Sequence, residues 1–211
     1  MTIQKSTRFG RWPFGLVLIA MLGVPLCMAR AAEGAQDAEA FIVGLAGQAI
    51  AALAPPGISR DEREIRARVL LNDNFAVPAI GQFVLGRYWR NATAEEQKEY
   101  LELFEKLIVV TYVDRFSRYS GERLKVTRSV WDKESGDTIV YSEISRPAGD
   151  PIEVGWRVRK YGSSLKIVDV LVEGVSMGQT QRSEFSSVIR NNGGSLSALL
   201  GEMRRRVRQE T

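Results

Sequence analysis

Residues 151–172 read PIEVGWRVRKYGSSLKIVDVLV, and this stretch decides the fold. In its first half apolar and polar residues alternate, which is typical of a strand with one buried and one exposed face. Gly162, Ser163 and Ser164 then form a turn of hairpin length. The second half is apolar at most positions, which indicates a strand that is central or covered on both faces. The stretch therefore predicts two neighbouring antiparallel strands.

The same period of two extends upstream from this stretch as far as Gly121. Turns that contain Gly136 and Gly149 divide the upstream region into two further strands. The predicted strands are Glu122–Trp131, Thr138–Arg146, Pro151–Tyr161 and Leu165–Val172. Because each connection is of hairpin length, the four strands are expected to form an antiparallel meander.

In the sequence before and after the four predicted strands, apolar residues recur at helical spacing. Ser59 and Thr93 each open a capping box, with Glu62 and Glu96 three residues later, and so mark helix starts. The predicted helices are 38–54, 59–72, 75–85, 93–119, 179–191 and 196–208. The fold class is α+β, with a helical N-terminal half packed on a twisted four-stranded antiparallel meander and two C-terminal helices. Such an arrangement tends towards a cone, and periodicity leaves open whether side chains fill it or an apolar cavity remains.

The longest predicted helix, 93–119, changes character along its length. Glu95, Glu99 and Glu102 form a polar stripe along one side of the first half. In the second half the same side carries the apolar residues Val109 and Val113. The second half is therefore apolar nearly all round, so either other helices bury it or it borders an apolar ligand. We expect this half to pack on the apolar face of the sheet.

Residues 1–31 have the three parts of a secretory signal peptide. Lys5, Arg8 and Arg11 form a positive beginning, residues 12–29 are uncharged, and small residues follow. Cleavage is expected after Ala29, Ala31 or Ala32, leaving residues 32–211 as a single domain in the periplasm. An uncleaved anchor is the alternative, although the uncharged run is short beside the roughly 20 residues that span a bilayer.

The signal accounts for the overall charge of the chain. The formal net charge is +4, and four basic residues with no acidic one lie in the signal, so the mature chain is neutral. This balance gives no reason to expect nucleic-acid binding. The lone cysteine, Cys27, leaves with the signal, and the absence of histidine excludes His-dependent triads and His-ligated metal or haem sites. No metal or cofactor is expected.

Three features leave alternatives open. Asp169 lies among apolar neighbours, so it either acts as an acid–base group with a tyrosine or caps a turn or pairs with an arginine. Residues 82–90, QFVLGRYWR, form either a packed elbow, with Arg90 bonding the preceding helix, or the rim of a binding site. The arginines of 204–208 either complement the helix dipole or contact anionic headgroups or an acidic partner.

Several motifs together resemble a known family. They are Phe83–Arg90, Thr93, Gln97, Phe104, Tyr112, Tyr119–Glu122, Val168–Ser176, Arg182, Phe185 and Gly194. In combination they resemble the MlaC family of periplasmic phospholipid-binding proteins, also called the toluene-tolerance family, over roughly residues 38–206. Leu165 stands where that family often has Trp, and Met177 where Leu is usual, so the departures bear on pocket shape.

The resemblance implies a monomeric periplasmic shuttle for diacyl phospholipid. Such a shuttle exchanges lipid between an outer-membrane lipoprotein–porin complex and an inner-membrane ABC transporter complex, maintains outer-membrane lipid asymmetry and catalyses no reaction. A branch of the family associated with hopanoids makes a polycyclic lipid an alternative ligand. The rival interpretation is a periplasmic enzyme of cone-shaped α+β fold acting on a lipid or steroid-like substrate through Asp169.

The family resemblance implies an apolar lining for acyl chains, and the sequence pattern selects which residues form it. From the long helix we expect Tyr112 and Phe116 to contact the tails. From the apolar side of the sheet we expect Ile144, Val154, Trp156, Val158, Val170, Val172 and Val175.

Overall fold

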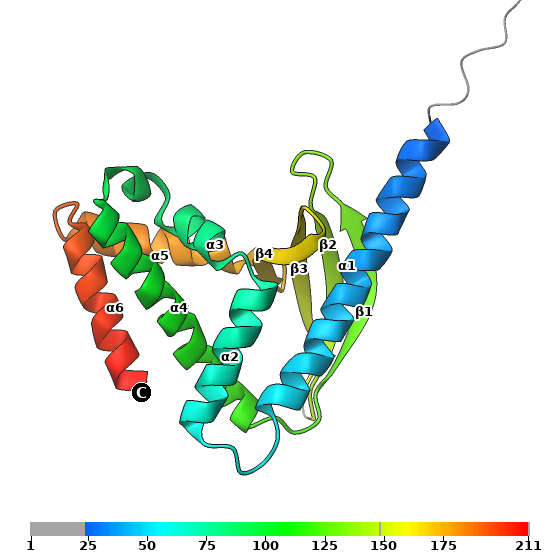
Figure 1. Cartoon of the computed structure of the whole chain (residues 1–211), viewed down its shortest axis with the longest axis horizontal. Coiled ribbons are helices and arrows are strands. Elements are labelled where there is room, and N and C mark those ends of the chain that lie inside the picture. Colours follow the sequence, from blue (N-terminus) through cyan, green and yellow to red (C-terminus); the bar gives the residue numbers. More distant parts are fainter. Residues whose placement is uncertain (1–23, 148, 211) are drawn as a thin grey trace, which may run out of the picture.

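The computed structural model describes residues 24–147 and 149–210 (Figure 1). The positive beginning of the predicted signal and the first part of its apolar run, residues 1–23, lie outside the described residues. The predicted cleavage positions fall within the first helix, α1 (Val24–Leu53). Within the described ranges, no helix combines the length and the apolar character that crossing a bilayer requires.

Five helical segments precede the sheet or lead into it, and the caps predicted from sequence begin two of them. They are α1, α2 (Arg60–Asn74), α3 (Val77–Leu85), the 3-10 helix η1 (Gly86–Asn91) and α4 (Ala94–Ser117). The Ser59 hydroxyl accepts a hydrogen bond from the Glu62 N–H at 3.1 Å, so it caps α2. At α4 the capping box is complete, because the Glu96 N–H donates to Thr93 Oγ1 and the Thr93 N–H donates to Glu96 Oε2.

The strands form one antiparallel sheet in chain order, as predicted, with one addition. They are β1 (Arg123–Trp131), β2 (Thr138–Ser145), β3 (Ile152–Tyr161), β4 (Ser164–Val172) and β5 (Val175–Ser176). The sequence did not predict β5, because a strand of two residues has no period to detect. It follows a two-residue turn in which Glu173 and Gly174 both have positive φ, at 50° and 77°, as tight hairpins between right-twisted strands require.

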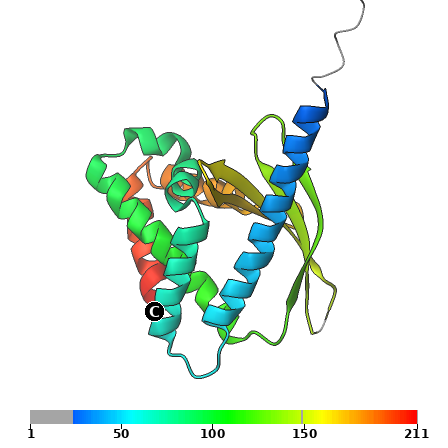
Figure 2. The same ribbon diagram turned by 45° about the vertical axis from the view of Figure 1, so that its right-hand side comes forward.

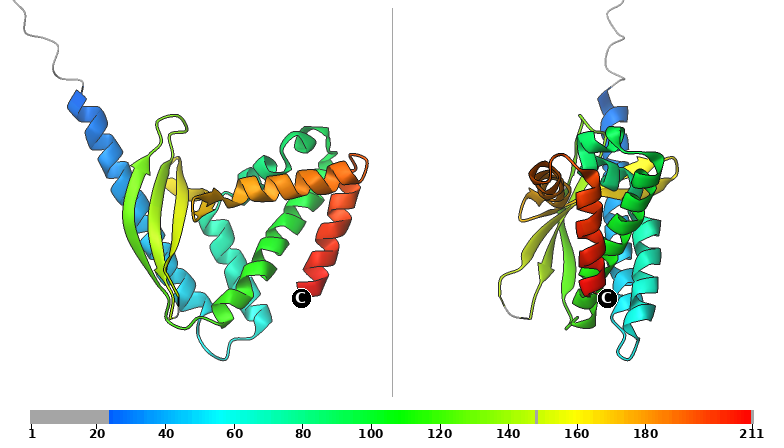
Figure 3. Two further views of the ribbon diagram at one scale, coloured as in Figure 1. Left: turned by 180° about the vertical axis from the view of Figure 1, so that it is seen from behind. Right: turned by 90° about the vertical axis from the view of Figure 1, so that its left-hand side faces the viewer.

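Two helices follow the sheet, α5 (Met177–Asn191) and α6 (Leu196–Glu210). Figure 3 shows α5 leaving the β5 end of the sheet and running to the far end of the molecule, where α6 turns back beside α4. The C-terminal helices therefore belong to the helical half of the molecule.

The helix that lies across the apolar face of the sheet is α1 (Figure 2). Ala38, Ile42 and Leu45 of α1 are buried in one cluster with Val140 and Ile167 of the sheet. The expectation that the second half of α4 packs on the sheet is therefore corrected, since the main neighbours of α4 are α6 and α2. Periodicity identifies an apolar face but not the element that covers it.

A second buried cluster holds the helices α2 to α6 together. At its centre is Tyr100, which is fully buried, donates its hydroxyl to the Gly81 carbonyl at 3.0 Å and stacks on Phe104. Burial raises the pKa of the Tyr100 hydroxyl well above its ordinary value. Val109 and Val113 are also buried, so protein covers this part of the second half of α4.

A limited set of contacts joins the two clusters. Phe75, between α2 and α3, packs against both and forms a parallel bridge with Ile167 of β4. The Lys166 ammonium caps the C-terminal end of α2 by donating to the carbonyls of Asn72 and Asp73. The Arg63 and Arg66 guanidinium groups of α2 also donate to the carbonyls of Leu53 and Ala52 at the end of α1. Away from these links, the helical half and the sheet diverge (Figure 1).

Candidate functional site

The inner face of the sheet, on the side of α1, is built by the strand register. Val140, Trp156 and Val170 stand in one row across β2, β3 and β4. The next row is Ser142, Val154 and Val172. Because paired residues in neighbouring strands point to the same side, the sheet residues predicted for the lining share this face. They are Ile144, Val154, Trp156, Val158, Val170, Val172 and, at the edge, Val175.

Burial divides these residues into two groups. Val154 and Val158 are buried and belong to the protein core. Ile144, Trp156, Val170 and Val172 are only half-buried, although they lie on the face that α1 covers. We call these four residues the inner-face patch. A core would normally bury such side chains completely, so the patch is apolar surface on which the protein packs incompletely.

The one polar group of the inner-face patch has its partner within the sheet. The Trp156 indole N–H donates to Ser142 Oγ at 2.9 Å, and the Ser142 hydroxyl donates to the Val154 carbonyl at 3.2 Å. Ser142 is completely buried beneath the indole. A molecule lying against Trp156 therefore meets an apolar ring surface with its polar atom already satisfied.

The remaining predicted lining residues lie at the margin of this face or on another element. Val175 is on β5 at the sheet edge and is 54% exposed. Tyr112, 43% exposed, and Phe116, half-buried, lie one turn apart on α4, whose main packing partners are α6 and α2. Contact of these three residues with a ligand stays a prediction, as it does for the inner-face patch.

Residues 82–90 form a packed elbow between α3 and α4. The Trp89 ring lies edge-on to Tyr100 with ring centres 6.3 Å apart, and Gln97 Nε2 donates to the Trp89 carbonyl at 2.9 Å. Gly86 has φ +59°, and a side chain there would meet the Arg182 guanidinium at 3.0 Å. The elbow is thus held by Gln97, Tyr100 and Arg182, while Arg90, expected to bond the preceding helix, is exposed.

Arg182 is a residue whose role sequence reasoning missed. It lies in α5, and its guanidinium is 5.1 Å from the centre of the Phe83 ring in α3. It therefore packs two elements that are about a hundred residues apart in the chain. No local pattern signals such a contact, since only the fold brings α3 beside α5.

Asp169 has a structural role at the corner between β4 and α5. Its carboxylate accepts hydrogen bonds from the Val170 N–H at 2.9 Å, the Ser176 hydroxyl at 2.6 Å and the Gly178 N–H at 3.1 Å. A side chain at Gly178 would lie 3.1 Å from Asp169 Oδ1, so the glycine permits this approach. The interpretation of Asp169 as a turn cap is the one that the geometry supports.

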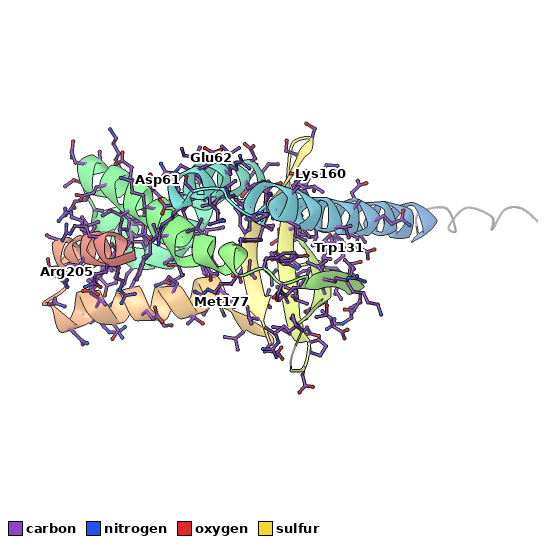
Figure 4. The ribbon with its side chains drawn as sticks, turned by 90° about the horizontal axis from the view of Figure 1, so that it is seen from below. Asp61, Glu62, Trp131, Lys160, Met177 and Arg205 are labelled. Atoms are coloured by element: carbon purple, nitrogen blue, oxygen red, sulfur yellow. The ribbon has the colours of Figure 1, made fainter. Side chains whose placement is uncertain are left out.

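The arginines near the C-terminus are paired with carboxylates. Arg204 pairs with Glu99 of α4, and Arg205 and Arg206 both pair with Glu202. Beside them, a groove of about 540 Å³ lies between α5 and α6. Its lining is mostly polar, which does not suit acyl chains, and Figure 4 shows Arg205 at the opposite end of the molecule from Trp131 of the sheet.

Comparison with known proteins gives three concordant results. The family model described as MlaC protein matches residues 46–205. An intermembrane phospholipid transport system binding protein MlaC of Haemophilus influenzae is 25% identical over 61% of this chain and 61% of its own length. The toluene tolerance protein ttg2D of Pseudomonas putida is 23% identical over 52% of this chain and 51% of its own length. The matched stretches thus span less than two thirds of each relative.

Among solved structures, a phospholipid-binding protein of Ralstonia solanacearum in complex with a phospholipid is similar in fold. The TM-score is 0.70 at 21% sequence identity, and the superposition covers 81% of this chain and 97% of the other. At this level of identity the likeness establishes the α+β fold that the two chains share.

Proposed function

The chain belongs to the MlaC family, and from this premise we propose that it is a periplasmic carrier of diacyl phospholipid. The carrier exchanges lipid between an outer-membrane lipoprotein–porin complex and an inner-membrane ABC transporter complex, and thereby maintains outer-membrane lipid asymmetry. It acts as a monomer, needs no cofactor and catalyses no reaction. A signal peptide in residues 1–31 directs it across the inner membrane.

The observation that carries this proposal is the inner-face patch. Its four side chains are apolar, lie on the face of the sheet that α1 crosses and remain half-buried. Each methylene of an acyl chain that leaves water for such a surface contributes about 0.8 kcal/mol. Two chains need only partial cover for tight binding, so a carrier of this kind can hold lipid and still release it.

The charge balance of the mature chain agrees with recognition through the tails. Equal numbers of acidic and basic residues remain once residues 1–31 are removed, so no excess charge is reserved for a headgroup. The enzyme alternative has less support, because all three hydrogen bonds of Asp169 hold backbone and side chain at the β4–α5 corner. The solved relative in complex with a phospholipid supports the same ligand class.

Mass spectrometry of the purified mature protein tests the proposal directly. Organic solvent extraction should release about one phospholipid molecule per protein chain. Recovery of a hopanoid in that amount would show that the ligand is a hopanoid and would leave the proposed carrier function in place. A lipid-free protein that also takes up no lipid from vesicles would overturn the carrier.

Two neighbouring substitutions in β4 test whether the inner-face patch is the binding surface. Val170 belongs to the patch, whereas Leu171 points to the opposite face, where it lies beside Gly155 and Tyr141. Both side chains are half-buried, so Val170→Gln and Leu171→Gln should destabilise the fold to a similar degree. Val170→Gln should lose most of the bound lipid and Leu171→Gln should keep it. Equal retention by the two variants would place the lipid elsewhere.

A further inference from the structure

The corner formed by α3, η1 and the start of α5 carries an unusual group of arginines. Arg87 and Arg90 are three residues apart in a 3-10 helix, which has three residues per turn, so they project from the same side of η1. Arg182 adjoins them from α5, where its guanidinium rests against Gly86 and the Phe83 ring. We call Phe83, Arg87, Tyr88, Arg90 and Arg182 the arginine corner.

No carboxylate pairs with the three guanidinium groups of this corner in the part of the chain that the structure describes. By contrast, arginines of α2, β3 and α6 are held in ion pairs, such as Arg68 with Glu105 and Arg204 with Glu99. The segment 74–94 contains no acidic residue. The next acidic residues along the chain are Glu95 and Glu96 in the first turn of α4, and the capping box engages Glu96. The corner is therefore a local excess of positive charge on a neutral mature protein.

Aromatic rings accompany this charge. Phe83 is 45% exposed although it is apolar, and Arg182 lies over its ring. The Arg87 guanidinium lies 5.0 Å from the centre of the Tyr88 ring and donates to the Tyr88 hydroxyl at 3.0 Å. Stacking holds the two guanidinium groups in place while leaving N–H donors free for an anion. Aromatic rings beside cationic groups also suit a membrane interface, because the ring can enter the headgroup region while the cation contacts lipid phosphate.

We propose that the arginine corner docks the protein on a bilayer surface that contains anionic phospholipid. The guanidinium groups are spread over η1 and α5 rather than converging on one point, which suits a surface with many phosphates. An exposed phenylalanine between them adds an apolar contact. This inference extends the proposed carrier function, because a lipid carrier has to reach the membranes that it serves.

Vesicle sedimentation of the lipid-loaded protein tests the docking surface. The protein should bind vesicles of equal parts phosphatidylglycerol and phosphatidylcholine, should not bind vesicles of phosphatidylcholine alone, and should be released by salt. The double variant Arg87→Gln with Arg90→Gln should bind the anionic vesicles about 30-fold more weakly, at about five-fold for each arginine near an anionic surface.

A matched control separates the arginine corner from charge in general. Arg123→Gln with Lys125→Gln also removes two positive charges, but from the exposed outer face of β1. This double variant should leave vesicle binding within about two-fold of the wild type. Equal weakening by both pairs, or no binding to anionic vesicles, would overturn the proposal. In the latter case an acidic protein surface becomes the candidate partner.

The lipid content of the same variants distinguishes failure of docking from failure of the carrier. Arg87→Gln with Arg90→Gln should retain as much extractable phospholipid as the wild type, because both side chains are exposed and lie on η1, whereas the inner-face patch lies on the sheet. Loss of lipid in this variant would contradict a docking role. A wild type that contains no lipid and takes up none, yet binds anionic vesicles, would overturn the carrier alone.

Discussion

Asp132 shows how a single side chain organises the turn between β1 and β2. Its carboxylate accepts hydrogen bonds from the Ser135 hydroxyl at 2.8 Å, the Arg157 guanidinium at 2.9 Å and the Glu134 N–H at 3.0 Å. These bonds, with that of Ser135 the largest, lower the pKa of Asp132 from 3.8 to about 2. The folded state thus holds the ionised form more tightly than the unfolded chain does.

The lowered pKa of Asp132 predicts an acid-dependent stability. Because the folded pKa lies below the unfolded value, the stabilisation is fully present above pH 3.8 and disappears as the pH falls through about 2. Carboxyl carbon NMR of the folded protein should show Asp132 titrating near this lower value. In Asp132→Asn the free energy of unfolding should depend less on pH over that interval. A carboxyl that titrates at its ordinary value would contradict the turn geometry.

At the scale of single residues, sequence reasoning recovered the chemistry of local motifs. The caps of Ser59 and Thr93 depend on neighbours within a few positions, and the structure confirms both. The strand register likewise places the apolar residues Val154, Trp156 and Val158 of β3 on one face. The contacts of Arg182 and Lys166 depend on elements about a hundred residues away. A sequence pattern shows that such a side chain is cationic but not which backbone it will reach.

At the scale of elements, the two capping boxes look alike in sequence and differ in structure. Glu96 returns a hydrogen bond to the Thr93 N–H. Glu62, at the equivalent position of α2, instead accepts from Arg66 Nε at 2.7 Å on the exposed side of the helix. The motif therefore predicts the helix start in both places, but it predicts the full reciprocal pair only at α4.

This difference leads to unequal costs for the same substitution. Glu96→Ala should lower the free energy of unfolding by about 1 kcal/mol, because it leaves a backbone N–H without its partner. Glu62→Ala removes an exposed ion pair between residues four apart and should cost less than about 0.5 kcal/mol. Urea denaturation of both variants measures the two costs. Both carboxylates lie in a first helical turn, so their dipole contributions cancel in the comparison, and equal costs would contradict the reciprocal bond at α4.

The sequence predicted the antiparallel meander correctly, but it did not predict which helix packs on the apolar face of the sheet. Hairpin-length turns imply neighbouring antiparallel strands, so the meander follows from sequence. The sheet then needs a helix on its apolar face, and both α1 and the second half of α4 carry suitable apolar residues. The structure places α1 there, whereas Val109 of α4 belongs to the helical cluster and Val113 is buried as well. Choosing between two apolar helices requires the path of the whole chain.

At the scale of the whole molecule, the protein has two cores rather than one. The helical cluster around Tyr100 and the cluster between α1 and the sheet share Phe75, and Leu70 of α2 also packs against the second cluster. Two residues of the inner-face patch, Trp156 and Val170, pack against the second cluster and still remain half-buried. A bound lipid would add the apolar contacts that the protein itself does not supply, which ties stability to lipid content.

Removal of the lipid should therefore destabilise the protein. A ligand that binds only the folded state stabilises it by about 2.7 kcal/mol when its concentration is 100 times Kd. At this chain length that stabilisation corresponds to a rise in Tm of about 5 to 10 °C. Calorimetry should show Tm falling by this amount after delipidation and recovering when extracted lipid is returned, in the wild type and in Leu171→Gln. Val170→Gln should show little change on either treatment, because its patch binds lipid poorly from the start. If wild-type Tm were independent of lipid, the inner-face patch would be satisfied without a ligand, and incomplete packing there would no longer support a carrier.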